Sequence, residues 1–320
     1  MVADGASRIP LRRALAIAFA AAVLWFGGRT LLAQWEAVRG VRAAHPVQWG
    51  GVLFASVLTL GSYAVLIETW RRTVAAWGGA IGYAAAARIW LVSNLGRYVP
   101  GKIWQIGAMS VLAERVGVSG AAAVGSALLV SLLHVAVGFA VVAASGGTLL
   151  GAYVPEGTPL LPVLAALVVA LASLPWTLPW AAVLASRLSG RPFAAHRFPP
   201  QAIWIAAAGS AAGWVLMGLA FHLLTIAVLG RPTGDAASSI AVFTLSYLAG
   251  FLALIAPGGI GVREAVLAGL LVQAGSTSVA EATWLVVASR LWLTVLEILP
   301  GVVLLLARPS SRPSSPSAPS

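Results

Sequence analysis

Two short stretches of this sequence combine helix-breaking residues with ionisable side chains, and chemistry is expected there. The first break, residues 94–105, reads Asn-Leu-Gly-Arg-Tyr-Val-Pro-Gly-Lys-Ile-Trp-Gln. The second break, residues 255–269, begins Ile-Ala-Pro-Gly-Gly-Ile-Gly-Val-Arg-Glu and lies within a long apolar run. Proline lacks the amide hydrogen that a helix needs, and glycine loses the most conformational freedom on folding. We therefore expect both stretches to interrupt apolar helices.

Cationic side chains stand at both breaks, with Arg97 and Lys102 at the first and Arg263 at the second. Main-chain N–H groups freed by a broken helix, together with such cations, suit a phosphate group. We interpret these residues as an anion site in which Glu264 orients Arg263 and balances its charge. As alternatives, Arg263 pairs within the protein, with Glu264 or Glu297, or Arg97 and Lys102 extend to the lipid surface.

The composition sets the class of protein that must position these residues. Of the 320 residues, 60% are hydrophobic and only 9% are charged, whereas a soluble domain carries roughly a quarter charged residues. The apolar runs are continuous rather than alternating, which favours membrane helices over the strands of a barrel. The net charge of +11 is scattered along the chain, so it does not indicate a nucleic-acid surface. The sequence predicts an all-α polytopic membrane protein.

Apolar runs of about 20 residues can cross a bilayer, and we expect about six such spans. They cover residues 14–32, 49–70, 119–144, 160–184, 203–229 and 283–306. The segments that flank the two breaks are too short to cross alone, so we expect two broken or re-entrant helical hairpins. These hairpins join residues 83–95 with 103–112, and residues 240–255 with 262–273. Outside the transmembrane domain (14–307), we expect a cytoplasmic N-terminus (1–13) and a disordered Pro/Ser-rich cytoplasmic tail (308–320).

The arginines predict an orientation in the membrane. With both termini inside, the short cytoplasmic segments hold most of the arginines, including Arg71 and Arg72, while Arg39, Arg42 and Arg231 stay outside. This distribution follows the positive-inside rule. The first hairpin then starts and ends inside, and the second starts and ends outside. Two broken hairpins of opposite orientation indicate an inverted repeat, with a site at the interface of its halves.

Other candidate sites are weaker. Arg290 and Glu297 are seven residues apart in an apolar run, so they share a helix face. They form either a structural ion pair with another helix or a proton-coupled site. His134 and His222 have no second ligand at metal spacing, so packing or a hydrogen bond is the better interpretation. Residues 96–102 have the glycine and lysine spacing of a P-loop, but Ile103 stands where a P-loop needs a hydroxyl for magnesium, so we expect no ATP site. We also expect no metal and no cofactor.

At the two breaks the sequence resembles the lysylphosphatidylglycerol synthase transmembrane region, the flippase-like half of the bacterial multiple peptide resistance factor. The resemblance extends from the second span to the last. It rests on Asn94, Arg97, Pro100, Gly101, Lys102, Pro257, Gly258, Gly259, Gly261, Arg263 and Glu264. In two-part relatives it implies a membrane region that moves aminoacylated phosphatidylglycerol and a soluble domain that makes it. The chain ends in a short Arg/Pro/Ser tail instead, so we expect a stand-alone form without aminoacyl transfer.

The resemblance and the breaks together predict a non-enzymatic protein of the bacterial inner membrane. It would bind or translocate an anionic phospholipid or a polyprenyl-phosphate-linked intermediate. The predicted substrate-binding residues are Asn94, Arg97, Lys102, Arg263 and Glu264, and the predicted helix-breaking residues are Pro100, Gly101, Pro257, Gly258, Gly259 and Gly261. The alternatives are a subunit or enzyme of lipid-linked sugar transfer, and a non-catalytic partner of a cytoplasmic enzyme. Expected partners are membrane lipids and a cytoplasmic synthase or glycosyltransferase, not nucleic acid.

Overall fold

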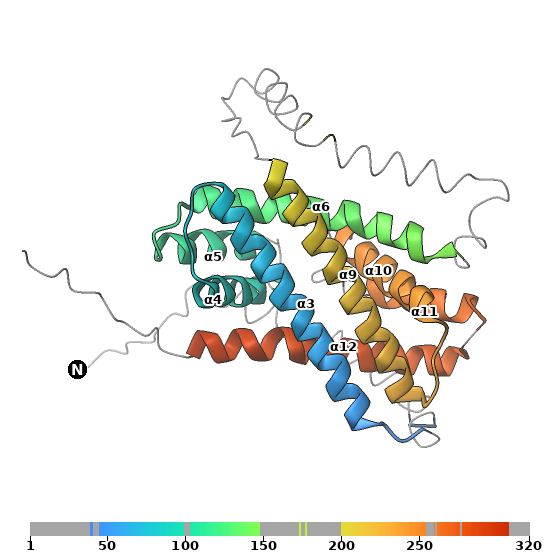
Figure 1. Cartoon of the computed structure of the whole chain (residues 1–320). Coiled ribbons are helices and arrows are strands. Elements are labelled where there is room, and N and C mark those ends of the chain that lie inside the picture. Colours follow the sequence, from blue (N-terminus) through green and yellow to red (C-terminus); the bar gives the residue numbers. More distant parts are fainter. Residues whose placement is uncertain are drawn as a thin grey trace, which may run out of the picture.

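The described part of the chain is all-helical, as the sequence predicted. The computed structural model describes residues 39–40, 45–98, 103–147, 173, 177, 200–253, 259, 261–275 and 277–306, and no strand occurs among them. Figure 1 shows its helices, which are α3 (Trp49–Ala76), α4 (Tyr83–Asn94), the 3-10 helix η1 (Leu95–Tyr98), α5 (Ile103–Glu114), α6 (Gly120–Ser145), α9 (Pro200–Leu229), α10 (Ala236–Leu252), α11 (Val262–Gln273) and α12 (Val279–Leu306).

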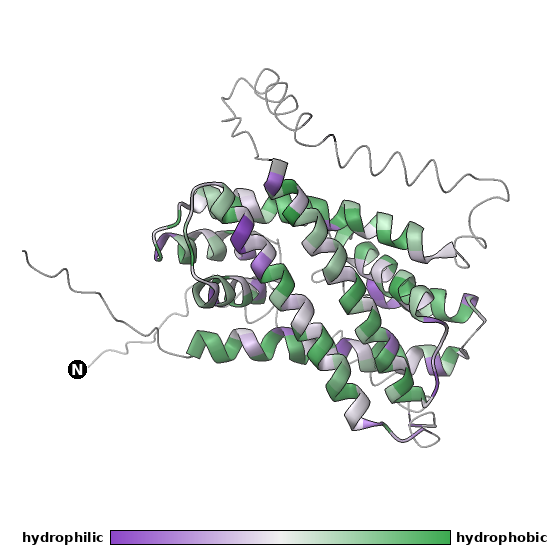
Figure 2. Cartoon of the chain, viewed as in Figure 1, coloured by the Kyte–Doolittle hydropathy of each residue, from purple (hydrophilic) through white to green (hydrophobic). Residues whose placement is uncertain are grey.

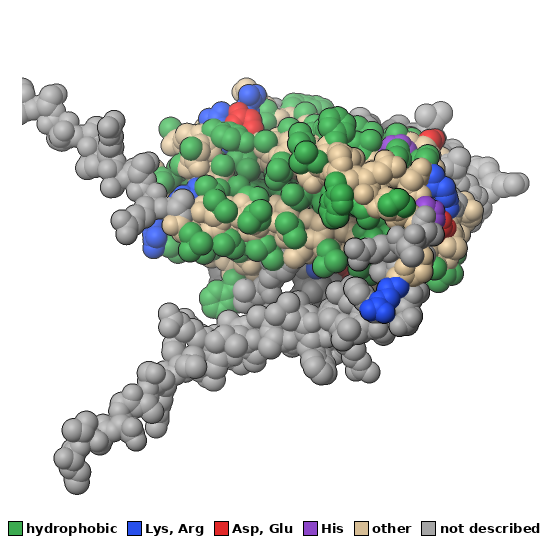
Figure 3. All heavy atoms as spheres, turned by 90° about the horizontal axis from the view of Figure 1, so that it is seen from below, with side chains coloured by type: hydrophobic (Ala, Val, Ile, Leu, Met, Phe, Trp, Pro, Cys, Tyr) green, Lys and Arg blue, Asp and Glu red, His purple; other side chains and the backbone are tan. Residues whose placement is uncertain are grey.

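Four of these helices, α3, α6, α9 and α12, are long and apolar enough to cross a membrane. They lie where four of the predicted spans were placed. The other two, residues 14–32 and 160–184, lie outside the described residues, as does the tail from residue 308. Figure 2 shows the apolar character of the long helices, and hydrophobic side chains predominate among the described side chains on the face in Figure 3. Such a surface suits lipid rather than water.

The described helices form two groups, and long and short helices follow one another in the same order in both groups. Each group has a long helix, a hairpin of two shorter helices and a second long helix: α3 to α6, then α9 to α12. In Figure 1, α4 and α5 lie to the left of the α3–α9 pair, while α10 and α11 lie to its right. The contacts repeat as well, because α6 packs against α10 and α12 packs against α4. The last helix of each group therefore reaches the hairpin of the other group.

The first helices of the two groups, α3 and α9, run in opposite directions. At one end the Gln48 N–H donates to the Ala227 carbonyl over 2.8 Å. Towards the other end Gly209 packs against Thr69. Antiparallel first helices and exchanged contacts agree with the inverted repeat that the charge distribution predicted.

Both broken hairpins are present where the sequence placed them. The helices α4 and α5 pack against each other on either side of η1 and residues 99–102, and α10 and α11 pack against each other on either side of residues 254–260. Helices of twelve residues such as α4, α5 and α11 are roughly 18 Å long, well short of a hydrocarbon core of ~30 Å. Neither half of the first hairpin can cross the core alone.

Two helices begin about one turn earlier than their apolar runs suggest, because polar residues cap them. The Asp235 carboxylate accepts from the Ser238 N–H over 2.7 Å at the start of α10. At the start of α12, Ser278 Oγ accepts from the Glu281 N–H, and the Glu281 carboxylate accepts from the Ser278 N–H. This reciprocal pair satisfies main-chain donors that a helix leaves open.

We expect Gly218→Ala to destabilise the packing of α9 against α10, because a Cβ at Gly218 would lie 2.5 Å from the Cα of Ile240. Main-chain atoms cannot rotate away, and overpacking of this kind costs about 1–3 kcal/mol. Gly61→Ala in α3 is the matched control, since a Cβ there meets no atom within 4 Å. Thermal unfolding in mild detergent should show a lower midpoint for Gly218→Ala only. An unchanged midpoint would contradict this close approach.

Candidate functional site

The second break folds back onto α10 through glycine contacts. Gly259 and Gly261 have φ angles of 70° and 88°, in the left-handed region that glycine adopts without strain. A Cβ at Gly259 would lie 2.6 Å from the carbonyl oxygen of Gly250, in α10. The break therefore needs glycine at position 259 both for its conformation and for the close approach of the two main chains. Pro257 and Gly258 lie outside the described residues.

Arg263, the second residue of α11, is buried by this fold. Only 6% of the residue is exposed, and a Cβ at Gly250 would lie 2.8 Å from the Cβ of Arg263. The guanidinium carbon lies 5.3 Å from the centre of the Phe243 ring and 4.9 Å from that of Tyr247. Such contacts attract a cation to the negative faces of aromatic rings. The aromatic cradle, Phe243 and Tyr247, thus holds the side chain that the sequence singled out.

One nitrogen of Arg263 is left with donor capacity. Its Nη2 is buried and has no hydrogen-bond partner among the described residues. A buried charged donor without an acceptor is costly, because the group has lost water and gained nothing in exchange. The arrangement therefore favours an acceptor, above all an anionic one, beside Nη2.

Glu264 forms no ion pair or hydrogen bond with Arg263 in the described part of the chain, so the contact predicted to orient Arg263 is not found there, although the charge of Glu264 still acts on Arg263. Its carboxylate accepts from the Gly261 N–H over 2.6 Å and lies 3.4 Å from Nη1 of Arg290. Successive residues of a helix do not face each other, so Glu264 points away from Arg263. Its observed partners fix the start of α11 and connect it to α12.

The secondary candidates Arg290 and Glu297 lie on α12, which packs against α11, the helix that follows the second break. Both charges are near enough to act on Arg263, as is that of Glu264. Two arginines and two glutamates thus form a charge cluster around the break, comprising Arg263, Glu264, Arg290 and Glu297. The formal charges of this cluster sum to zero, so it does not carry a large excess of positive charge when no ligand is bound.

At the first break, Asn94 connects the two sides of the hairpin. It is 7% exposed, and its Oδ1 accepts from Nε2 of Gln105 over 2.6 Å. Gly96 allows the main chains to approach, because a Cβ there would lie 2.8 Å from the amide nitrogen of Gln105. Only the main chain of Arg97 is described, and Pro100, Gly101 and Lys102 lie outside the described residues.

The two histidines take part in packing and hydrogen bonding, as the sequence suggested. The His134 ring stacks on Trp214 with ring centres 4.2 Å apart. Nδ1 of His222 is 2.9 Å from Oγ of Ser239.

Both breaks lie within a region that a family profile recognises. The profile described as "Lysylphosphatidylglycerol synthase TM region" matches residues 13–301. The chain belongs to this family. Searches of curated proteins and of solved structures found no match. Family membership and the four long apolar helices together make this a helical membrane protein, and they bear out the resemblance drawn from the two breaks.

A double-mutant cycle should show that Glu264 and Arg290 act together. Glutamine at position 264 keeps an oxygen for the Gly261 N–H and removes only the charge, so Glu264→Gln and Arg290→Gln isolate the ion pair. We expect a coupling of about 1 kcal/mol in thermal unfolding, as for partly buried pairs. As a control, Glu264→Gln combined with Arg231→Gln should be additive, because Arg231 pairs with Glu281. Additive effects of the first pair would contradict the contact.

Proposed function

We propose that this protein binds an anionic lipid by its phosphate at the second break and moves it between the leaflets of the bacterial inner membrane. Buried Arg263 carries the proposal, because its Nη2 has donor capacity and no acceptor among the described residues. Ionised groups at membrane depth are rare and usually mark a substrate site or pathway. A guanidinium suits phosphate oxygens in charge and geometry.

The start of α11 supports the same ligand. The first N–H groups of a helix have no partner within it, and the helix dipole favours an anion there. Glu264 uses the Gly261 N–H, which leaves the N–H groups of the first turn as further donors. Phe243 and Tyr247 hold the guanidinium carbon in place, so less side-chain freedom is lost when a phosphate binds.

Charge balance links the two breaks in this proposal. The charge cluster at the second break is formally neutral, so a phosphate would bring an uncompensated negative charge into a poorly hydrated region. We propose that Arg97 and Lys102 of the first break supply the compensating charge, with Asn94 as a further contact. The site would then lie between the two hairpins, as in transporters built from inverted repeats.

The lipid class follows from the chemistry of the head group. A phosphate next to an apolar tail is shared by anionic phospholipids and by polyprenyl-phosphate-linked intermediates, and we propose that the substrate belongs to one of these. We further propose a transport role rather than an enzymatic one, with both termini in the cytoplasm and a cytoplasmic synthase or glycosyltransferase as partner. Movement would follow a lipid gradient or an ion gradient.

Arg263→Gln should abolish selective retention of an anionic lipid, because an amide provides neither the charge nor the forked donor of a guanidinium. Native mass spectrometry after mild detergent extraction would measure the lipid, and liposomes with labelled phosphatidylglycerol or polyprenyl phosphate would measure transfer between leaflets. Arg231→Gln removes the same charge from an exposed ion pair and is the control. Equal retention and transfer by the two variants would overturn the proposal.

Cysteine labelling should test the proposed orientation, since the chain contains no cysteine of its own. Ala80→Cys places a thiol between α3 and α4, and Pro232→Cys places one between α9 and α10. Both native residues are exposed. A membrane-impermeant maleimide added to spheroplasts should label position 232 and should reach position 80 only after lysis. The reverse result, or labelling of both before lysis, would contradict the inverted arrangement.

A further inference from the structure

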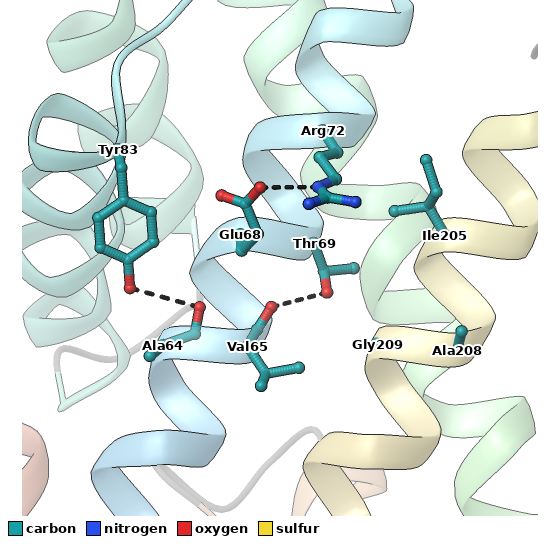
Figure 4. A pocket seen from close by; sticks show the side chains of 9 residues that line it. All are labelled: Ala64, Val65, Glu68, Thr69, Arg72, Tyr83, Ile205, Ala208 and Gly209. Carbon is teal, nitrogen blue, oxygen red and sulfur yellow. Dashed lines mark hydrogen bonds and ion pairs between the residues drawn. The ribbon is translucent and has the colours of Figure 1, made fainter.

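A groove lies between the antiparallel helices α3 and α9, away from the charge cluster at the second break. Its volume is about 660 Å³, within the range of ligand-binding clefts. Ala64 and Val65 line it on α3, and Ile205 and Ala208 line it on α9. Tyr83 of α4 is a further lining residue, on the other side of α3 from α9 in Figure 4. The walls are therefore mainly apolar. This groove is called the α3–α9 groove below.

Small residues create the α3–α9 groove. Gly209 packs directly against Thr69, and a Cβ at position 209 would collide with the Thr69 hydroxyl. The two helices therefore meet closely at the floor. Ala64 and Ala208 are exposed, and their short side chains leave the space above that contact open. Because these two residues are exposed, the groove is open to the surroundings of the described helices.

A fixed pair of arginines stands at one end of the groove. The Glu68 carboxylate accepts two hydrogen bonds from Arg71 and one from Nε of Arg72, each 2.7 Å long. Arg72 uses only its Nε in the hydrogen bonds found among the described residues, and its side chain is 58% exposed. One carboxylate and two guanidinium groups leave a formal charge of +1 at this end, with the terminal nitrogens of Arg72 accessible.

The charged end lies at the depth of lipid head groups. Trp49 begins α3 and is 74% exposed, as expected for an aromatic residue at the membrane interface. Glu68 is nineteen residues further along the same helix, which places it ~29 Å from Trp49 along the axis. This length matches a hydrocarbon core of ~30 Å. Arg72 therefore reaches the opposite interface while the apolar walls remain beside the acyl chains.

We propose that the α3–α9 groove binds one phospholipid of the surrounding bilayer that has an anionic head group. An acyl chain lies between the walls formed by Ala64 and Ala208, and the phosphate accepts hydrogen bonds from Arg72. Glu68 is a positioning residue that keeps the two guanidinium groups together. The formal charge of +1 at the arginine end matches one phosphodiester. The site uses no residue of the second break, so it stands independently of the proposed lipid transfer through Arg263.

Fluorescence quenching by brominated lipids tests this site. The protein carries no native cysteine, so Ala208→Cys can be labelled with bimane within the groove. Val57→Cys on the same helix pair is the control, because Val57 is 56% exposed and does not line the groove. Nanodiscs would contain the same fraction of brominated phosphatidylglycerol or brominated phosphatidylcholine. We expect stronger quenching by phosphatidylglycerol at position 208 and equal quenching by both lipids at position 57.

Two further variants decide what causes this preference. Arg72→Gln should remove it at position 208, and Ala64→Trp, which fills the groove without touching Arg72, should remove it as well. Arg263→Gln should leave it intact, so a failure of the proposed transfer function is distinguishable from a failure of this site. Equal quenching by the two lipids in the otherwise unchanged protein, or a preference that survives Arg72→Gln, would overturn the proposal. Loss of the preference in Arg263→Gln would also overturn it as an independent site.

Discussion

The structure depends on shielding a broken helix and its arginine from hydrocarbon. Lipid tails cannot hydrogen-bond main-chain groups or solvate a guanidinium, so both must be enclosed by protein. Gly250, Gly259 and Arg263 accomplish this by direct contact between α10 and the break. Phe243 and Tyr247 then cover the guanidinium carbon. The same enclosure that permits the break also leaves Nη2 of Arg263 buried without an acceptor among the described residues.

The exchange of contacts between the two groups of helices gives the breaks a physical connection. On α12, Arg290 contacts Glu264 of the second break, and a Cβ at Gly301 would lie 2.9 Å from the Leu91 carbonyl oxygen, just before the first break. One helix therefore touches both hairpins. The related helix α6 packs against α5 and α10 in the same manner. A displacement of either long helix would therefore reach both breaks.

Local signals in the sequence predicted the framework and the breaks, and contacts between distant segments escaped prediction. The predicted helix at residues 262–273 coincides with α11. Its start could be predicted because the glycines and the proline of the break lie directly before residue 262. The aromatic cradle was missed, since it arises only when α10 packs on α11, although Phe243 and Tyr247 at helical spacing were a visible signal. The partner of Glu264 was missed because it depends on the path of α12. Ser278 and Glu281 had the spacing of a capping box, and this readable signal was overlooked.

The central claim is that buried Arg263 holds the phosphate of a lipid. A structure of the protein in nanodiscs that contain phosphatidylglycerol tests it most directly. The account predicts a phosphate group within hydrogen-bond distance of Nη2 of Arg263, between the two hairpins, with its acyl chains extending into the bilayer. A structure in which Nη2 donates to a carbonyl or carboxylate of the protein itself, with no head group nearby, would contradict the account. Arg263 would then stabilise the break without binding a substrate.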